Sequence, residues 1–101
     1  GVAGSPGTAT GRARVVLDPA DPFALEAGDV LVAPITDPAW TPLFVPAVAV
    51  VVNVGASVSH AVIVSRELGI PCVVSVTDAT ERIPDGAMIH VDGEAGTVTI
   101  L

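Results

Sequence analysis

Basic residues are scarce in this sequence. It contains no lysine and only four arginines among 101 residues, whereas eleven side chains are acidic, so the net charge is −7. Surfaces that bind nucleic acid or anionic membranes need clustered cationic groups that neutralise phosphates. The composition therefore argues against nucleic acid and membrane surfaces as partners of this protein.

Cysteine, aromatic residues and long hydrophobic runs are also few. Cys72 is the only cysteine, so no internal disulfide can form, and a reducing compartment fits. The valine-rich run at residues 48–54 is far shorter than the ~20 residues of a transmembrane helix, and no signal-peptide pattern is visible. We therefore expect a cytoplasmic location. Because only one tryptophan and two phenylalanines occur, the core must be mostly aliphatic.

Several catalytic chemistries lack the residues that they need. One cysteine and two histidines, His60 and His90, are too few and too far apart for a zinc site. No Gly-x-Ser-x-Gly elbow occurs, and the glycine-rich start at residues 4–8 has no lysine for a P-loop. We therefore expect no metal and no cofactor bound within these residues.

Short hydrophobic runs alternate with helical patterns and predict an α/β domain. Residues 1–11 hold four glycines and predict an irregular lead-in. We expect strands at 12–17, 30–33, 48–52, 72–76, 88–91 and 97–101, and helices at about 38–44 and 59–68. The middle strands alternate with helices, which implies right-handed parallel crossovers, whereas both ends look antiparallel. The predicted fold is a parallel sheet with helices on one face and a smaller antiparallel layer on the other.

The length suits a single domain with its own core. The sequence opens with Gly1 and Val2 and carries no initiating methionine. We therefore expect residues 1–101 to be one domain, cut from a larger multidomain polypeptide.

One histidine lies where a tight loop enters a helix. The valine strand ends at Val52, small residues follow at 55–57, and the helix expected from about Ser59 to Leu68 starts beside His60. The first turn of a helix carries unpaired N–H groups and a partial positive charge, which together bind anions. The same charge favours a neutral imidazole, whose lone pair can attack phosphorus. His60 is therefore the predicted nucleophile for a phosphoryl group.

Neighbouring residues complete this predicted phosphate site. Gly55, Ala56 and Ser57 have little bulk, so a large phosphate donor can approach. Ser57 and Ser59 can cap the helix or donate hydrogen bonds to the phosphate. Thr36 lies in the loop after a predicted parallel strand, at the edge where ligands of open α/β sheets collect, so we assign it a supporting role.

Other notable side chains have simpler structural explanations. Asp37 is well placed as the N-cap of the helix at 38–44. His90 lies within a strand and is expected to be structural, and Cys72 is expected to be a small buried hydrophobe. Arg66 does not share the face of His60 on its helix, so an ion pair is expected for it. Three side chains at helical spacing are expected in the core: Trp40, Leu43 and Phe44.

The helix at 59–68 is apolar over most of its circumference. Ala61, Val64 and Leu68 are predicted to point inward, but Val62 and Ile63 lie on other faces. A helix that faced only water would show a polar outer face. We therefore expect a second contact, in the assembled protein, near the His60 end of this helix.

The segment GASVSHAVIVSRELGIPCVV, residues 55–74, resembles the phosphohistidine signature of the swivelling, mobile domain of phosphoenolpyruvate-utilising enzymes. That group includes pyruvate phosphate dikinase, phosphoenolpyruvate synthase and rifampicin phosphotransferase. The segments GSPGTATGRARVV, LEAGDVLVAPITDPAWTPLF and DGAMIHVDGEAGTVTIL also fit its layout, so the resemblance spans nearly the whole chain.

Three positions depart from the family pattern. Ala56 stands where a second glycine is usual, and Ser75 also replaces a usual glycine. Val58 stands where many members have the threonine that is a regulatory phosphorylation site in plant-type dikinases, so such control is not expected here. The Val-Ser-His order is more similar to the synthase-like and antibiotic-phosphotransferase branch.

The resemblance implies a three-layer β/β/α fold and a phosphoryl group carried on His60. It implies that the domain swivels between an ATP-grasp nucleotide-binding domain, which would bind ATP and magnesium, and an acceptor domain. The acceptor would be of the pyruvate or phosphoenolpyruvate type, or an antibiotic, and the isolated domain would not turn over alone. Two alternatives remain open: a catalytically inactive swivelling domain that acts as an interaction module, and a stand-alone phosphocarrier protein.

Overall fold

The computed structural model describes residues 1–20, 24–54 and 59–101. None of the helices in these ranges is long and apolar enough to cross a membrane. The elements, in chain order, are β1 (Val2–Ser5), β2 (Thr8–Val15), β3 (Val30–Ala33), the short 3-10 helix η1 (Pro38–Trp40), α1 (Thr41–Phe44), β4 (Ala49–Val52), α2 (His60–Leu68), β5 (Cys72–Val74), α3 (Ala79–Arg82), β6 (Met88–Asp92) and β7 (Thr97–Ile100).

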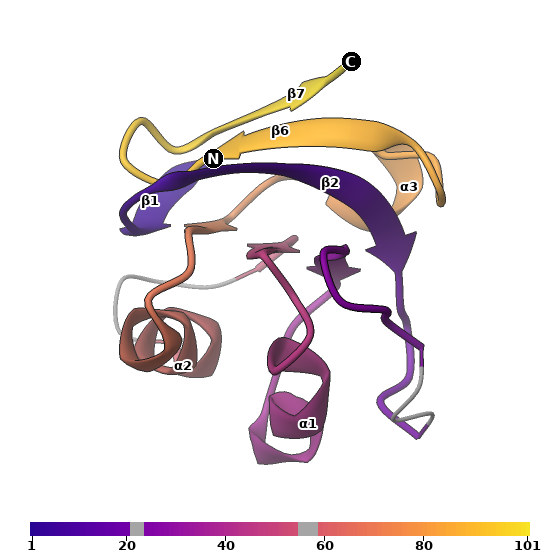
Figure 1. The fold of residues 1–101 in the computed structure, drawn as a ribbon, viewed down its shortest axis with the longest axis vertical. Helices are drawn as coiled ribbons and strands as arrows, with labels where there is room; N and C mark the ends of the chain where they lie inside the picture. Colours follow the sequence, from indigo (N-terminus) through magenta and orange to yellow (C-terminus); the bar gives the residue numbers. More distant parts are fainter. Residues whose placement is uncertain (21–23, 55–58) are drawn as a thin grey trace.

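The strands form a mixed sheet in the order β1-β5-β4-β3-β2-β6-β7 (Figure 1). β2, β3, β4 and β5 pair in parallel, whereas β1 against β5, β2 against β6 and β6 against β7 are antiparallel. β2 belongs to both parts, because Thr8–Arg12 pairs with β6 and Ala13–Val15 pairs with β3. The predicted parallel centre with antiparallel ends is confirmed.

Every residue of β3, β4 and β5 is buried, as expected for strands covered on both faces. α1 and α2 cover one face, and β6, β7 and α3 close the other (Figure 1). We call the packing under the two helices the helix-side core, which includes Leu31, Trp40, Leu43, Phe44, Val50, Ala61 and Val62. We call the packing on the other face the hairpin-side core, which includes Val30, Val32, Val51, Val73, Ala79, Ile83, Ile89 and Val91. The predicted three-layer α/β fold is therefore confirmed.

A buried carboxylate joins β2 to the turn before β3. Asp29 accepts hydrogen bonds from Nε and Nη2 of Arg12, at 3.3 and 3.0 Å, and from the backbone N–H of Glu26 at 3.0 Å. Burial alone would raise the pKa of Asp29, but these hydrogen bonds and the charge of Arg12 outweigh it and hold the pKa below its usual value. The ionised carboxylate therefore stabilises the start of the parallel sheet.

The prediction of an irregular lead-in over residues 1–11 was wrong. Val2–Ser5 forms β1 at one edge of the sheet, and β2 begins at Thr8 instead of residue 12. The glycines of this segment serve close packing: a Cβ on Gly4 would lie 2.9 Å from Cγ2 of Val62, and one on Gly11 would collide with the carbonyl of Gly28. The local sequence is glycine-rich because distant segments approach these backbones, not because the chain is irregular.

Candidate functional site

Helix α2 begins at His60, and the backbone conformation of the flanking residues defines both of its ends. Ser59 is extended at the N-cap position, with φ −69° and ψ 164°. At the other end, Gly69 adopts the left-handed conformation with φ 72°, and its N–H donates to the carbonyl of Arg66. The N–H of Ile70 donates to the carbonyl of Ser65, which completes a Schellman motif. The predicted cap at Gly69 is confirmed, and the histidine lies in the first turn of the helix.

The imidazole of His60 is held between two threonines. Oγ1 of Thr36 lies 2.9 Å from Nδ1, and Oγ1 of Thr41 lies 3.3 Å from Nε2. The ring of Phe44 meets the imidazole edge-to-face, with ring centroids 5.6 Å apart and an interplanar angle of 81°. Thr36 is buried and Thr41 is exposed, whereas His60 is half-buried. The ring plane is therefore fixed, and its Nε2 side is the more open one.

Parallel pairing explains why Thr36 and His60 meet. Ala33 and Val52 are paired at the ends of β3 and β4, so both chains leave the sheet at the same edge. The N–H of Val54 then donates to the carbonyl of Pro34 at 3.1 Å, which keeps the two exits side by side. The threonine follows one strand and the histidine follows the other. The supporting position predicted for Thr36 agrees with this geometry.

The neighbouring aspartate has a different task. Oδ1 of Asp37 accepts a hydrogen bond from the N–H of Ala39 at 2.9 Å, and Pro38 stands at the first position of η1. This is the predicted helix cap. Because η1 and α1 follow directly, the cap also sets the position of Thr41 and Phe44 against the imidazole.

The two ring nitrogens are both satisfied in the neutral form of the imidazole. A hydroxyl can donate one hydrogen bond and accept others, so one ring N–H can donate to a threonine while the other ring nitrogen accepts from the second threonine. Protonation of both nitrogens would make both of them donors, and either hydroxyl could still accept. The geometry alone therefore permits each tautomer. A ring nitrogen can attack an incoming group only after the threonine hydroxyl beside it has moved away.

The side chain of Ser59 does not cap the helix. Its Oγ is buried and has no hydrogen-bond partner among the residues that the structure describes, and no side-chain cap hydrogen bond forms at α2. An unpartnered buried hydroxyl at a helix N-terminus is a donor for an incoming anion. The other predicted phosphate-binding residues, Gly55, Ala56 and Ser57, lie outside the described ranges.

The predicted inward face of α2 was wrong in part. Ala61, Val62 and Ser65 are the buried residues of the helix, so Val62, predicted on another face, points inward, whereas Leu68 is 47% exposed. The helix therefore meets the sheet through a face that includes a serine, whose small side chain lets the helix approach β5. Ile63 is 50% exposed, so an apolar outer surface is present as expected.

The remaining candidates are structural in the described part of the chain. His90 pairs with Thr10 across β6 and β2, where Nδ1 lies 2.8 Å from Oγ1. Nε of Arg66 donates to the carbonyl of Gly4 at 2.9 Å, so the expected ion pair is replaced by a link between α2 and β1. Burial raises the pKa of the Cys72 thiol to about 11, as expected for a small core residue. No cluster of three or more metal-ligating side chains occurs in residues 1–20, 24–54 and 59–101.

The model of the family described as PEP-utilising enzyme, mobile domain, matches residues 25–96 of this sequence. The chain belongs to this family. Within the mobile domain, the matched region contains His60 and both threonines that contact it.

Two curated relatives are larger proteins that each contain a region similar to this chain. The chain is 50% identical over 97 residues to a rifampicin phosphotransferase of Streptomyces sviceus, covering 96% of this chain and 11% of that protein. It is 48% identical over 99 residues to a phosphoenolpyruvate synthase of Aeropyrum pernix, covering 97% of this chain and 12% of that protein. The chain thus spans about a tenth of the length of these relatives.

A solved structure shares the fold of the mobile domain. A solution NMR structure of Enzyme I superposes with a TM-score of 0.69 and 29% sequence identity, covering 79% of this chain and 33% of that one. This likeness agrees with the α/β architecture described above.

Sequence reasoning missed the contacts of Thr41 and of the Phe44 ring with the histidine. Phe44 was correctly expected in the core, and it is fully buried. Its second role depends on the packing of α1 against α2, which no local pattern displays. The one available signal was the position of Thr41, directly after a capped turn that begins beside Thr36.

Proposed function

We propose that this mobile domain is a phosphoryl carrier, in which Nε2 of His60 accepts a phosphoryl group and passes it to an acceptor bound in another domain. The observation that carries the proposal is the 2.9 Å contact between Nδ1 of His60 and the buried hydroxyl of Thr36. Of the two tautomers that the geometry permits, we assign the one in which Nδ1–H donates to Oγ1 of Thr36. The lone pair then lies on Nε2, which faces the exposed Thr41.

The first transfer step needs only a movement at the open side of the ring. The hydroxyl of Thr41, 3.3 Å from Nε2, gives way to the phosphate donor. The Nε2 lone pair attacks phosphorus, a P–N bond forms, and the bridging P–O bond of the donor breaks with its electron pair leaving on the nucleotide. Thr36 accepts from Nδ1–H throughout and so stabilises the positive charge that develops on the ring.

The second step reverses the chemistry with a different oxygen. An acceptor oxygen attacks the phosphorus of phosphohistidine, the P–N bond breaks, and its electron pair returns to Nε2. While the phosphoryl group is carried, its oxygens can accept hydrogen bonds from the first-turn N–H groups of α2 and from Oγ of Ser59. Gly55, Ala56 and Ser57 are proposed to line the same site.

The donor and acceptor would be held by other domains. An ATP-grasp domain that binds ATP and magnesium is the proposed donor site, and it would lie in the same polypeptide as the acceptor site. The relatives named for rifampicin and for phosphoenolpyruvate suggest two acceptor classes. Exposed apolar side chains near His60, Ile63 on α2 and Ile35 beside Thr36, would be covered when a partner domain docks.

The test is phosphorylation of the natural full-length protein by radiolabelled ATP. We expect label that is acid-labile and alkali-stable, present in the wild type and absent in His60→Ala. The matched control is His90→Ala, which removes the other histidine, on β6, and should keep full labelling. Circular dichroism of both variants checks that each is folded.

Each contrary outcome has a distinct meaning. Label that survives in His60→Ala, or that is lost in His90→Ala, would sink the assignment of the nucleophile. A folded wild-type protein that takes no label from ATP or phosphoenolpyruvate would favour an inactive interaction module. Label that appears only when separate proteins are added would favour a stand-alone phosphocarrier.

A further inference from the structure

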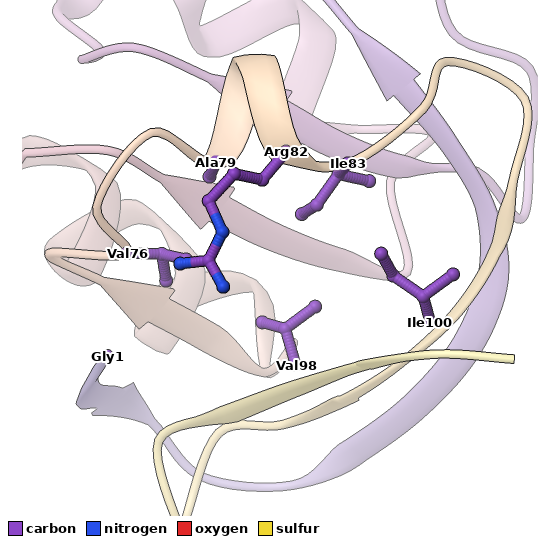
Figure 2. Close-up of a pocket in the computed structure, with 7 residues that line it drawn as sticks. All are labelled: Gly1, Val76, Ala79, Arg82, Ile83, Val98 and Ile100. Carbon is purple, nitrogen blue, oxygen red and sulfur yellow. The ribbon is translucent and has the colours of Figure 1, made fainter.

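A cavity lies on the side of the sheet away from His60. It has a volume of about 310 Å³, lies between α3 and the strand β7 (Figure 2), and is open to solvent on one side. Two residues of its wall, Ala79 and Ile83, belong to the hairpin-side core, whereas α2 packs into the helix-side core. The cavity is therefore separate from the histidine site, and an inference about it does not depend on the proposed function.

Five apolar side chains line the cavity together with Gly1 and Arg82, and polar and apolar atoms contribute similar amounts of its exposed surface. β6 and β7 pair with Val91 opposite Val98 and Ile89 opposite Ile100. Because Val91 and Ile89 point into the core, their partners on β7 point to the same face. The strand β7 reaches beyond the packed core, so Ile100 remains 50% exposed. The apolar side chains of the lining come from α3, the residues next to it and β7: Val76, Ala79, Ile83, Val98 and Ile100.

One cation, the exposed side chain of Arg82, lines this space. The guanidinium of Arg82 extends from α3 between Val76 and Val98 (Figure 2). Among the described residues, its side chain makes a single, long hydrogen bond, from Nη1 to the carbonyl of Thr77 at 3.5 Å. No carboxylate of the described residues lies within ion-pair distance of Arg82. By contrast, Arg12 contacts Asp29 and Glu26, and Arg14 contacts Asp85.

We propose that this cavity binds a small carboxylate with a hydrocarbon tail, with the carboxylate on Arg82 and the tail under β7. An arginine fork pairs with a carboxylate through two N–H groups, and Arg82 has donors to spare for it. At ~30 Å³ for each water-sized group, the cavity holds roughly ten heavy atoms, which is the size of a medium-chain fatty acid.

The charge of the rest of the protein sharpens the choice of ligand. The net charge of −7 repels anions at a distance, Glu81 precedes Arg82 on α3, and Asp78 is the N-cap residue of that helix. Binding must therefore come from local contact and not from a general positive field. This favours a ligand with a single negative charge and a substantial apolar part over inorganic phosphate or a nucleotide.

The test is titration of the 101-residue protein with octanoate, followed by NMR shifts of backbone and methyl groups. We expect saturable shifts confined to the cavity wall, above all at Val98, Ile100 and Ala79. Octanol, of the same length but neutral, should bind about tenfold more weakly, and octylamine should not bind because its cation meets Arg82.

Two variants separate the charge from the cavity. Arg82→Gln should weaken octanoate binding about tenfold and make octanoate and octanol equal. Arg14→Gln, at a cation outside the cavity, should leave octanoate binding unchanged. Val98→Trp should fill the space and remove the binding of both ligands, and the spectrum of each variant shows whether it is folded.

The proposal is overturned if octanoate leaves the cavity resonances unmoved up to its solubility limit. It is equally overturned if Arg82→Gln and the wild type bind octanoate alike, or if Arg14→Gln weakens octanoate as much as Arg82→Gln does.

Discussion

Replacing Thr36 by valine should slow the phosphorylation of His60 without unfolding the protein. Valine keeps the β-branched shape, so the substitution removes only the hydroxyl at a position that is 8% exposed. The lost hydrogen bond to Nδ1 costs about 1–2 kcal/mol, because the ring nitrogen is left without a partner in a buried place. If this cost falls on the transition state, the rate constant should drop roughly 5- to 30-fold.

The rate can be measured without any partner domain. Phosphoramidate, a small phosphoryl donor that reacts with histidine without an enzyme, is added to the 101-residue protein, and the product is followed by mass spectrometry. Phosphorus NMR then identifies the modified nitrogen, which we expect to be Nε2 in the wild type and a mixture of Nε2 and Nδ1 in Thr36→Val. The matched control is Thr41→Val, whose hydroxyl lies on the open side, 3.3 Å from Nε2. It should react at least as fast as the wild type.

Two results would refute this reasoning. If Thr36→Val reacts within twofold of the wild type and still gives only the Nε2 product, Thr36 does not fix the proton on Nδ1. If Thr41→Val is the slower variant, the roles of the two nitrogens are exchanged. Both results leave the identity of His60 as the acceptor untouched, because His60→Ala tests that separately.

Two further predictions concern the scaffold. Gly69→Ala should lower the free energy of unfolding by about 1 kcal/mol and the melting temperature by about 4–8 °C, because a residue with a Cβ is strained at φ 72°. No steric clash adds to this cost, since an added Cβ meets nothing within 4 Å. An unchanged melting temperature would contradict this. Burial would raise the pKa of Asp29, but Arg12 and the N–H of Glu26 lower it in the folded state. The ionised Asp29 therefore stabilises the folded protein fully above the unfolded pKa of about 3.9, and this stabilisation is lost as the pH falls through the folded pKa. Asp29→Asn should therefore unfold more easily at neutral pH and lose less stability on acidification, as urea titrations from about pH 6 to 3 would show; parallel pH profiles for the two proteins would speak against it.

The central sheet could be predicted because its signals are local. Runs such as Val30–Ala33 and Ala49–Val52 are continuously apolar and are bounded by prolines, glycines or polar residues. A strand buried on both faces needs no partner to reveal itself in the sequence. The same holds for the caps at Asp37 and Gly69, where a single residue type and its neighbours fix the backbone.

The strand β1 and the first residues of β2 escaped prediction because their signals are not local. β1 contains Gly4 and pairs with β5, about seventy positions away in the register that joins Val2 to Val74. The glycine weakens the strand pattern, yet it is required because Val62 approaches the backbone there. A rule that treats glycine as a sign of irregular structure fails wherever the packing of a distant residue selects the glycine.

The histidine site was also predictable only in part. The position of His60 at the start of α2 follows from the strand, the loop and the Gly69 cap, all of which are visible in the sequence. The position of Thr36 follows from parallel pairing, which the alternation of strands and helices implies. The contacts of Thr41 and Phe44 with His60 depend on how α1 packs against α2, and the sequence of neither helix specifies this packing.

The proposed transfer needs more than the side chains that the domain itself supplies. Phosphohistidine is open to attack by water, and a site that keeps it must exclude water while a partner is docked. His60 is held by the hydroxyl of Thr36 on its Nδ1 side, but Ile35 and Ile63 near it are 59% and 50% exposed. Exposed apolar side chains beside the half-buried imidazole suit docking against another domain. Covering them would stabilise the docked state and would exclude water from the imidazole. The domain would then contribute the nucleophile and one wall, and each partner in turn would contribute the opposite wall.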